Sequence, residues 1–195
     1  MDQWLVAGLG NPGDRYARTR HNAGAVVADL LASEAGARFR KARFVPVEIA
    51  EIAIDGRKAW LAKSLRFMNE SGPSYASIAK KHDVTPDHVI AVHDEIDLPF
   101  GALKVKIGGS TAGHNGLKSI VAHLGDQVSR LRVGVGRGES QRDLADHVLS
   151  RFEKDEAAEV ERMTTRAADA AEMFITSGIG AVMNTFNGGD PATTE

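Results

Sequence analysis

The chain has 195 residues, of which 43% are hydrophobic and 26% charged, and its formal net charge is −2. A chain of this size can bury one core, so we expect a single domain over residues 1–187 and a loose tail over 188–195. It contains no cysteine, which excludes disulfide scaffolds, cysteine-type zinc sites and thiolate nucleophiles. No apolar run approaches the roughly 18 residues of a membrane helix, and no signal peptide is recognisable, so we expect a soluble, cytoplasmic protein.

The chain begins with a strand and a helix. Residues 4–9 form a short apolar run that ends in Gly10-Asn11-Pro12-Gly13, which predicts a buried strand closed by a turn. Apolar residues then recur at helical spacing over 23–32, and Asn22 is the expected N-cap of that helix.

A hairpin and a second strand–helix alternation follow. Residues 45–54 and 59–65 flank Asp55-Gly56, a dipeptide typical of a tight β-hairpin turn. The spacing of apolar residues over 71–81 predicts a helix, and 89–93 predicts another buried strand.

The second half continues the alternation. Strands are expected at 103–107 and 131–135, with a helix at 116–124 between them. A long amphipathic helix is expected from Lys154 onward, with a final helix at 179–186. Strands that alternate with helices in this way predict a three-layer α/β domain.

The first turn has the spacing of a dinucleotide-binding motif, Gly8-Leu9-Gly10-Asn11-Pro12-Gly13. Such a turn opens directly into a helix whose amides bind the pyrophosphate. Here the polar segment 14–20 separates the glycines from the first helix. We therefore favour a rigid turn that presents Asn11 at the end of the first strand.

His21 lies between this turn and the first helix, in an arginine-rich segment that we expect to be accessible. An imidazole has an unperturbed pKa of about 6.5 and can accept a proton from water at neutral pH. A single loop histidine is more often an ordinary surface residue, so the prediction that His21 acts as a base depends on its neighbours.

The apolar strand 89–93 ends abruptly in Asp94-Glu95, and the carboxyl ends of strands face the ligand crevice in α/β sheets. A carboxylate that accepts the Nδ1 proton of an imidazole leaves Nε2 free to act as a base, and Asp94 suits that role for His21. Two alternatives stay open. The acids could simply cap a turn, or a metal could bind the set His93, Asp94, Glu95 and His114, although the helical spacing of a zinc motif is absent.

Asparagines stand in three turns between strands and helices, at Asn11, Asn69 and Asn115. Single turn asparagines are common because they tolerate left-handed backbone geometry. Because all three turns lie between a strand and a helix, however, we expect them to share one edge of the sheet, where their carboxamides would suit a peptide backbone and a developing oxyanion.

The glycine-rich segment 108–116 resembles the nucleophile elbow G-x-S-x-G around Ser110, but Ala112 replaces the final glycine and no strand runs directly into the serine. We favour an amide-rich loop that can approach phosphate, flanked by Lys104, Lys106 and Lys118. Residues 101–142 carry seven lysines or arginines against two acids, whereas 153–172 carry seven acids against three bases. The basic segment is either a solvated face or a site for a polyanion.

Six ordered motifs resemble those of bacterial-type peptidyl-tRNA hydrolases over nearly the whole chain. They are 8–13, Tyr16 with 19–24, 67–72, 93–99, 113–118 and 130–132. The resemblance implies a monomeric, single-domain α/β/α sandwich around a mixed, mostly parallel sheet. It also implies hydrolysis of the ester that joins a peptide to the 3′-terminal ribose of tRNA, with no metal or other cofactor.

The resemblance also implies roles for individual residues. His21 matches the catalytic base and Asp94 the carboxylate that orients it, and Asn11 belongs to the same catalytic group. The residues expected to contact the peptidyl part of the substrate are Tyr16, Met68, Asn69, His114 and Asn115. The cations expected at the tRNA 5′-phosphate and acceptor stem are Lys104, Lys106 and Arg132. Residues 137–149 match a mobile lid beside the cleft.

The chain departs from the family pattern at 63–66, at Thr111-Ala112 and at Gly138. These departures affect the expected shape of the groove and the stiffness of the lid, and they remove no catalytic group. The alternative from another functional class is a non-catalytic RNA-binding protein, which would need the basic segment but not His21.

Overall fold

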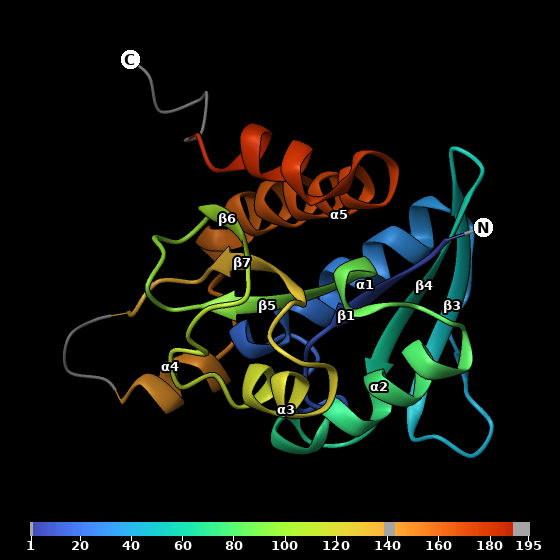
Figure 1. Ribbon diagram of the computed structural model, residues 1–195. Helices are drawn as coiled ribbons and strands as arrows, with labels where there is room; N and C mark the ends of the chain where they lie inside the picture. The colour runs from blue at the N-terminus through green and yellow to red at the C-terminus, as the bar shows by residue number, and fades with distance from the viewer. Residues whose placement is uncertain (1, 139–142, 189–195) are drawn as a thin grey trace.

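A computed structural model describes residues 2–138 and 143–188, and within these ranges seven strands form one sheet in the order β2-β3-β4-β1-β5-β7-β6 (Figure 1). The centre of the sheet is parallel: β1 (Gln3–Gly8) lies between β4 (Arg57–Ser64) and β5 (Val89–Glu95), and β7 (Ser129–Gly134) follows β5. The remaining strands pair antiparallel at the two edges, namely β2 (Arg40–Lys41), β3 (Val47–Ile54) and β6 (Leu103–Ile107). The sheet is mixed and mostly parallel at its core, as the sequence predicts.

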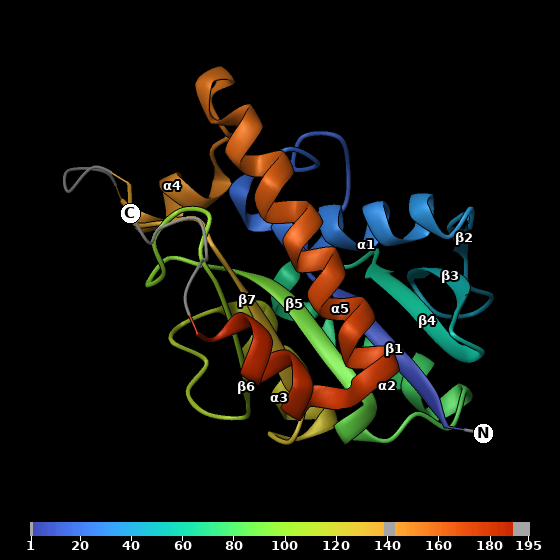
Figure 2. The ribbon, with the colours of Figure 1, turned by 90° about the horizontal axis from the view of Figure 1, so that it is seen from above.

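Helices cover both faces of the sheet. Figures 1 and 2 show α1 (Ala23–Glu34) and α5 (Ala157–Phe186) on one face, while α2 (Gly72–Lys81) and α3 (Asn115–Leu124) lie on the other. Strand alternation explains the two layers, because Trp4 and Val6 pack toward α1 and α5, whereas Leu5 and Ala7 pack toward α2 and α3. The three-layer α/β/α arrangement is therefore confirmed.

Two glycine positions shape the chain near the sheet. The hairpin between β3 and β4 turns through Asp55 and Gly56, both at positive φ (49° and 75°), as a tight two-residue turn requires. At the start of α1, a Cβ on Gly24 would lie 1.9 Å from the carbonyl oxygen of Val92. Only glycine lets the first turn of α1 approach the end of β5 this closely.

Several details differ from the sequence prediction. Two elements were not predicted from the sequence, namely β2 and the six-residue α4 (Leu144–Leu149). The two expected C-terminal helices run as one element that is broken by the non-helical Gly178 (φ 80°). Except for Gly188, the expected tail 188–195 lies outside the described residues. None of the helices within 2–138 and 143–188 is long and apolar enough to cross a membrane.

Candidate active site

The carboxyl ends of the parallel strands meet at one edge of the sheet and carry the polar turns that the sequence singled out. Asn11 follows β1, Asn69 follows β4, and Asp94 is the last residue but one of β5. Because β1 lies between β4 and β5, these groups converge on one place. Such an edge is where α/β sheets commonly bind ligands.

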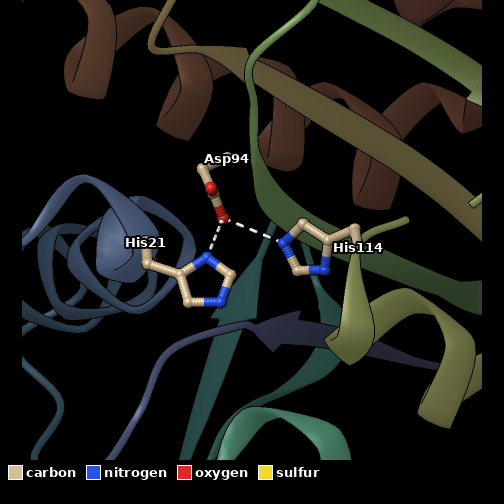
Figure 3. Close-up of side chains that lie close together, drawn as sticks. All are labelled: His21, Asp94 and His114. Carbon is tan, nitrogen blue, oxygen red and sulfur yellow. Dashed lines mark hydrogen bonds and ion pairs between the residues drawn. The ribbon is translucent and has the colours of Figure 1, made fainter. Parts of the chain in front are cut away.

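His21 and Asp94 form a hydrogen-bonded pair at this edge. His21 belongs to a short 3-10 helix (Arg20–Asn22) just before α1. Its Nδ1 lies 2.9 Å from Oδ1 of Asp94 (Figure 3). The His21 side chain is 14% exposed, whereas that of Asp94 is 3% exposed. The pairing expected from the sequence is therefore present, although His21 is less accessible than its arginine-rich surroundings suggest.

His114 approaches the same carboxylate oxygen from the other side. Its Nε2 lies 2.9 Å from Asp94 Oδ1 (Figure 3), an interaction that was not predicted from the sequence. The other ring nitrogen, Nδ1, accepts the backbone N–H of Leu117 and so caps α3. Because Nδ1 is an acceptor, the neutral ring carries its proton on Nε2 and donates it to Asp94.

The charge of Asp94 is set by these two rings. Burial alone would raise the pKa of its carboxyl group, but the proximity of His114 and the hydrogen bonds from both imidazoles outweigh burial and hold the pKa well below its usual range. Asp94 is therefore ionised at neutral pH. A carboxylate facing His21 Nδ1 favours the tautomer that is protonated at Nδ1 and leaves Nε2 as a free base.

His93 also contacts Asp94, through a hydrogen bond to its backbone. Its Nδ1 donates to the backbone carbonyl of Asp94 at 2.7 Å, and its ring meets His114 edge-on, with centroids 4.9 Å apart. His93 is 1% exposed. Burial, followed by the proximity of His114, lowers its pKa to about 3, so the ring is neutral.

Asn11 is held in place by Asn22. The Asn22 carboxamide accepts the backbone N–H of Asn11 and donates to its carbonyl, both at 2.9 Å. Asn22 occupies the predicted N-cap position of α1, but its side chain makes no capping hydrogen bond to the helix. Asn11 Oδ1 in turn accepts the backbone N–H of Met68 at 2.8 Å. This leaves Nδ2 of Asn11 as the group that can donate to a ligand.

These residues line a crevice of about 700 Å³. Its wall includes Phe67 and Ile96, which were not predicted as site residues. It also includes most of the residues that were, namely Asn11, His21, Met68, Asn69, Asp94, His114 and Asn115. Among the described residues, the side chains of Asn69 and Asn115 have no hydrogen-bond partner and are exposed. Tyr16 does not line this crevice, but its ring meets that of Phe67 with centroids 6.4 Å apart.

The expected cations lie on the neighbouring strands. Lys104 is opposite Arg132, and Lys106 is opposite Arg130. All four alternate with core residues that face α5, so they point to the α2–α3 side of the sheet. Arg132 pairs with Glu95 at 3.0 Å. Burial, together with the positive charges of Arg132 and Arg130, lowers the pKa of Lys106.

Arg130 was not identified from the sequence as a site residue. Its side chain is almost fully buried, and Nη1 donates to the carbonyl of Ser110 at 2.8 Å. Lys106 Nζ reaches the same carbonyl at 3.4 Å. Arg130 therefore holds the loop between β6 and α3, which ends at His114, and the longer, exposed contact from Lys106 adds little to it.

The geometry weighs against the two alternative chemistries. The four-residue metal set does not converge, because His93 Nδ1 donates to a backbone carbonyl and Glu95 pairs with Arg132. His21, Asp94 and His114 place their potential ligand atoms within 4.8 Å of one another, but the two hydrogen bonds from the imidazoles to Asp94 already account for the facing atoms. The hydroxyl of Ser110 accepts the backbone N–H of Ala112, a local turn rather than a nucleophile–base pair.

Comparison with known proteins identifies the family. Residues 5–194 match the family model described as peptidyl-tRNA hydrolase. The chain belongs to the peptidyl-tRNA hydrolase family. It is 48% identical over 181 residues to the peptidyl-tRNA hydrolase of Mycobacterium sp. (strain KMS), covering 92% of this chain and 94% of the relative. The protein of the same name from Mycobacterium tuberculosis (strain ATCC 25618 / H37Rv) is 47% identical, with 92% and 95% covered.

Solved structures agree with the family assignment. The crystal structure of peptidyl-tRNA hydrolase from Acinetobacter baumannii matches with a TM-score of 0.89 and 32% identity, and the match covers 96% of each chain. Membership of this family agrees with the cytoplasmic location expected from the sequence. The crevice is bordered by α4, through Leu144, Ala145, Val148 and Leu149. The expected lid 137–149 thus contributes to the crevice wall, although residues 139–142 lie outside the described part.

Proposed function

We propose that the protein hydrolyses the ester between a peptide, or an N-blocked amino acid, and the 3′-terminal ribose of tRNA, with His21 as the general base. One observation carries the proposal: His21 Nδ1 lies 2.9 Å from a buried, ionised Asp94, in a crevice that also presents three asparagine side chains. Family membership supplies the substrate class. The geometry supplies a base, its orienting carboxylate and donors for the carbonyl group.

The reaction begins with a water molecule next to His21. Nε2 removes a proton from the water while its oxygen attacks the ester carbonyl, and Asp94 stabilises the imidazolium that forms. As the tetrahedral intermediate collapses, His21 returns the proton to the leaving 3′ oxygen of the ribose. The products are a peptide with a free carboxyl group and a tRNA with a free 3′-hydroxyl.

The asparagines divide into two groups. Asn11 has its Oδ1 engaged by Met68 and its backbone held by Asn22, so Nδ2 is a fixed donor that suits the developing oxyanion or the attacking water. Asn69 and Asn115 are exposed, and their carboxamides can both donate to and accept from a peptide backbone.

The tRNA would be held by the cations of β6 and β7. Lys104, Lys106 and Arg132 share one face of these strands, beside the crevice rather than inside it. Burial, and after it the positive charges of Arg132 and Arg130, lower the pKa of Lys106. A bound phosphate would relieve the repulsion among these cations. The parts of the tRNA expected to bind these cations are the 5′-phosphate and the acceptor stem.

The protein is expected to be a monomer, which sedimentation can check.

Removal of the two lysines should weaken substrate binding without affecting the chemistry. We expect Lys104→Ala/Lys106→Ala to raise KM for peptidyl-tRNA and to reduce the dependence of log KM on log salt concentration by about 1 for each phosphate group that is no longer bound. Hydrolysis of a short acyl-nucleotide should be unchanged. Lys80→Ala/Lys81→Ala, two exposed lysines of α2, is the matched control. Equal reductions in activity on the two substrates would contradict a phosphate-binding role.

The direct test of the function is release of label from tRNA charged with N-acetylated, radiolabelled amino acid. The proposal expects release from this substrate and much slower release from the matching aminoacyl-tRNA with a free α-amino group. A non-catalytic RNA-binding protein would bind both tRNAs and release nothing. Absence of release under conditions where binding is measured would refute the proposed function.

A further inference from the structure

A second cleft lies next to the active-site crevice. It has a volume of about 490 Å³ and is formed by residues 44–46 before β3, by the segment 66–77 that leads into α2, and by Ser119 and His123 of α3. Asn69 lines both this cleft and the crevice. The second cleft therefore adjoins the active-site crevice at Asn69.

The strand order indicates in which direction the substrate would run through the crevice and the second cleft. From the centre of the sheet at β1, the cations of β7 and β6 lie toward one edge, whereas β4 and β3 lie toward the other. The second cleft borders the end of β4 and the start of β3. If the ribose of the ester faces the cations, the acyl chain must leave the His21–Asp94 pair toward β4 and β3, that is, toward the second cleft.

The wall of the second cleft is apolar on one side. Phe44 is 91% exposed and has a positive φ of 67°, an uncommon conformation for a non-glycine residue. Its neighbours Val45 and Pro46, and Pro73 across the cleft, add further apolar surface. When a ligand covers an exposed aromatic ring beside a hollow, the apolar surface removed from water favours binding.

The other side of the cleft is polar and able to bind amide groups. Asn69 offers a carboxamide that has no partner among the described residues. His123 Nδ1 donates to the carbonyl of Ser119 at 2.8 Å, which leaves Nε2 of the neutral ring as an acceptor. Ser77 is exposed on α2 at the rim. Arg66 and Glu70 also line the cleft, and they pair with each other at 4.0 Å, so their charges offset one another. Apolar surface combined with these donors and acceptors suits an extended peptide of varied sequence.

We propose that this second cleft binds the peptide of peptidyl-tRNA at residues upstream of the one esterified to the ribose. The proposal rests on the function proposed above. An extended peptide advances about 3.3–3.6 Å per residue, so an N-acetylated single amino acid ends within the crevice, whereas a peptide of several residues continues past Asn69. The cleft would lower KM for longer peptides and leave the chemical step unchanged, because its interactions are equal in the ground and transition states.

The test compares two substrates, N-acetyl-aminoacyl-tRNA and tRNA carrying an N-acetylated pentapeptide with the same C-terminal residue. Ser77→Trp fills the cleft from its rim. We expect it to lower kcat/KM for the pentapeptide substrate about tenfold through KM, a change that corresponds to about 1.4 kcal/mol. The same variant should hydrolyse N-acetyl-aminoacyl-tRNA at the wild-type rate. Ser33→Trp, at an exposed serine of α1 on the opposite face of the sheet, is the matched control and should change neither rate.

A second variant keeps the proposal testable if Ser77→Trp fails to fold. Phe44→Ala removes an exposed ring without disturbing the core, and it should reduce kcat/KM severalfold for the pentapeptide substrate only. Equal reductions on both substrates, or no reduction on either substrate with both variants, would overturn the proposal. Failure of the proposed function itself would look different, since wild-type protein would then hydrolyse neither substrate.

Discussion

Asp94 organises the active site because one of its carboxylate oxygens accepts two imidazole N–H groups. His114 is fixed as an Nε2–H donor by its cap of α3, and His21 is left to donate from Nδ1. Both tautomers therefore follow from hydrogen bonds that the fold already makes. The pair of donors also keeps the Asp94 carboxyl ionised despite its burial, because it holds the pKa of that group low. His21, the proposed base, is thus oriented before a substrate arrives.

The buried His93 should make the protein less stable in mild acid. Its pKa is about 3 in the folded protein and about 6.5 in the unfolded chain, so between these values only the unfolded state takes up the proton. Stability is thus lost as the pH falls below about 6.5. From pH 7 to pH 5 this single group should lower the free energy of unfolding by about 2 kcal/mol.

Urea denaturation of the wild type and of His93→Gln at pH 7 and pH 5 measures this effect. The difference in unfolding free energy between the two pH values should be about 2 kcal/mol smaller in the variant, because glutamine does not titrate. His88→Gln, which changes a partly exposed histidine just before β5, is the control. An unchanged pH difference in His93→Gln would show that His93 is protonated in the folded protein.

At the scale of elements, the short helix that carries His21 is fixed from both ends. Arg20 Nη2 donates to both carboxylate oxygens of Glu156, at 2.9 and 2.7 Å, and Nη1 donates to Ser150 and to the carbonyl of Arg151. Asn22 binds the backbone of Asn11. The segments that follow α4 and precede α5 are thereby tied to the turn that holds His21, the proposed base.

Arg20→Met should therefore affect both stability and catalysis. Loss of a buried, multiply hydrogen-bonded cation should lower the free energy of unfolding by about 2–3 kcal/mol. It should also lower kcat, since His21 would no longer be held at hydrogen-bond distance from Asp94. Arg18→Met, at an exposed arginine two residues earlier, is the control for charge. Normal kcat in a folded Arg20→Met protein would mean that this anchor does not position His21.

At the scale of the whole molecule, the strand order fits the arrangement proposed for the substrate. The proposed base lies near the centre of the sheet, the cations lie on β6 and β7, and the second cleft lies beside β3 and β4. A substrate with an RNA end and a peptide end can thus lie along one edge of the sheet with its ester at His21.

Much of this arrangement was predictable because it depends on local patterns. The apolar runs that became β1 and β5, the Asp55-Gly56 turn and the helical spacing of α1 and α2 each carry their own signal. The polar turns at strand ends predicted that Asn11, Asn69 and Asn115 would share an edge, and they do. Once the central strands are parallel, the convergence of His21 and Asp94 follows.

The features that were missed depend on tertiary interactions. The two residues of β2 are exposed, and α4 is too short to show helical periodicity. Arg20 and Arg130 are buried although arginine is usually exposed. The bond from His114 to Asp94 joins residues 20 positions apart, and no spacing rule links a loop histidine to a strand carboxylate.

The most direct test of the central claim is single-turnover hydrolysis of N-acetyl-aminoacyl-tRNA by His21→Ala, with the dissociation constant of the same substrate measured in parallel. Loss of a general base should slow the chemical step about 10²- to 10⁴-fold and leave substrate affinity unchanged. His88→Ala, at a histidine that does not line the crevice, should keep the wild-type rate. A His21→Ala rate within a few-fold of wild type would contradict the assignment of His21 as the base.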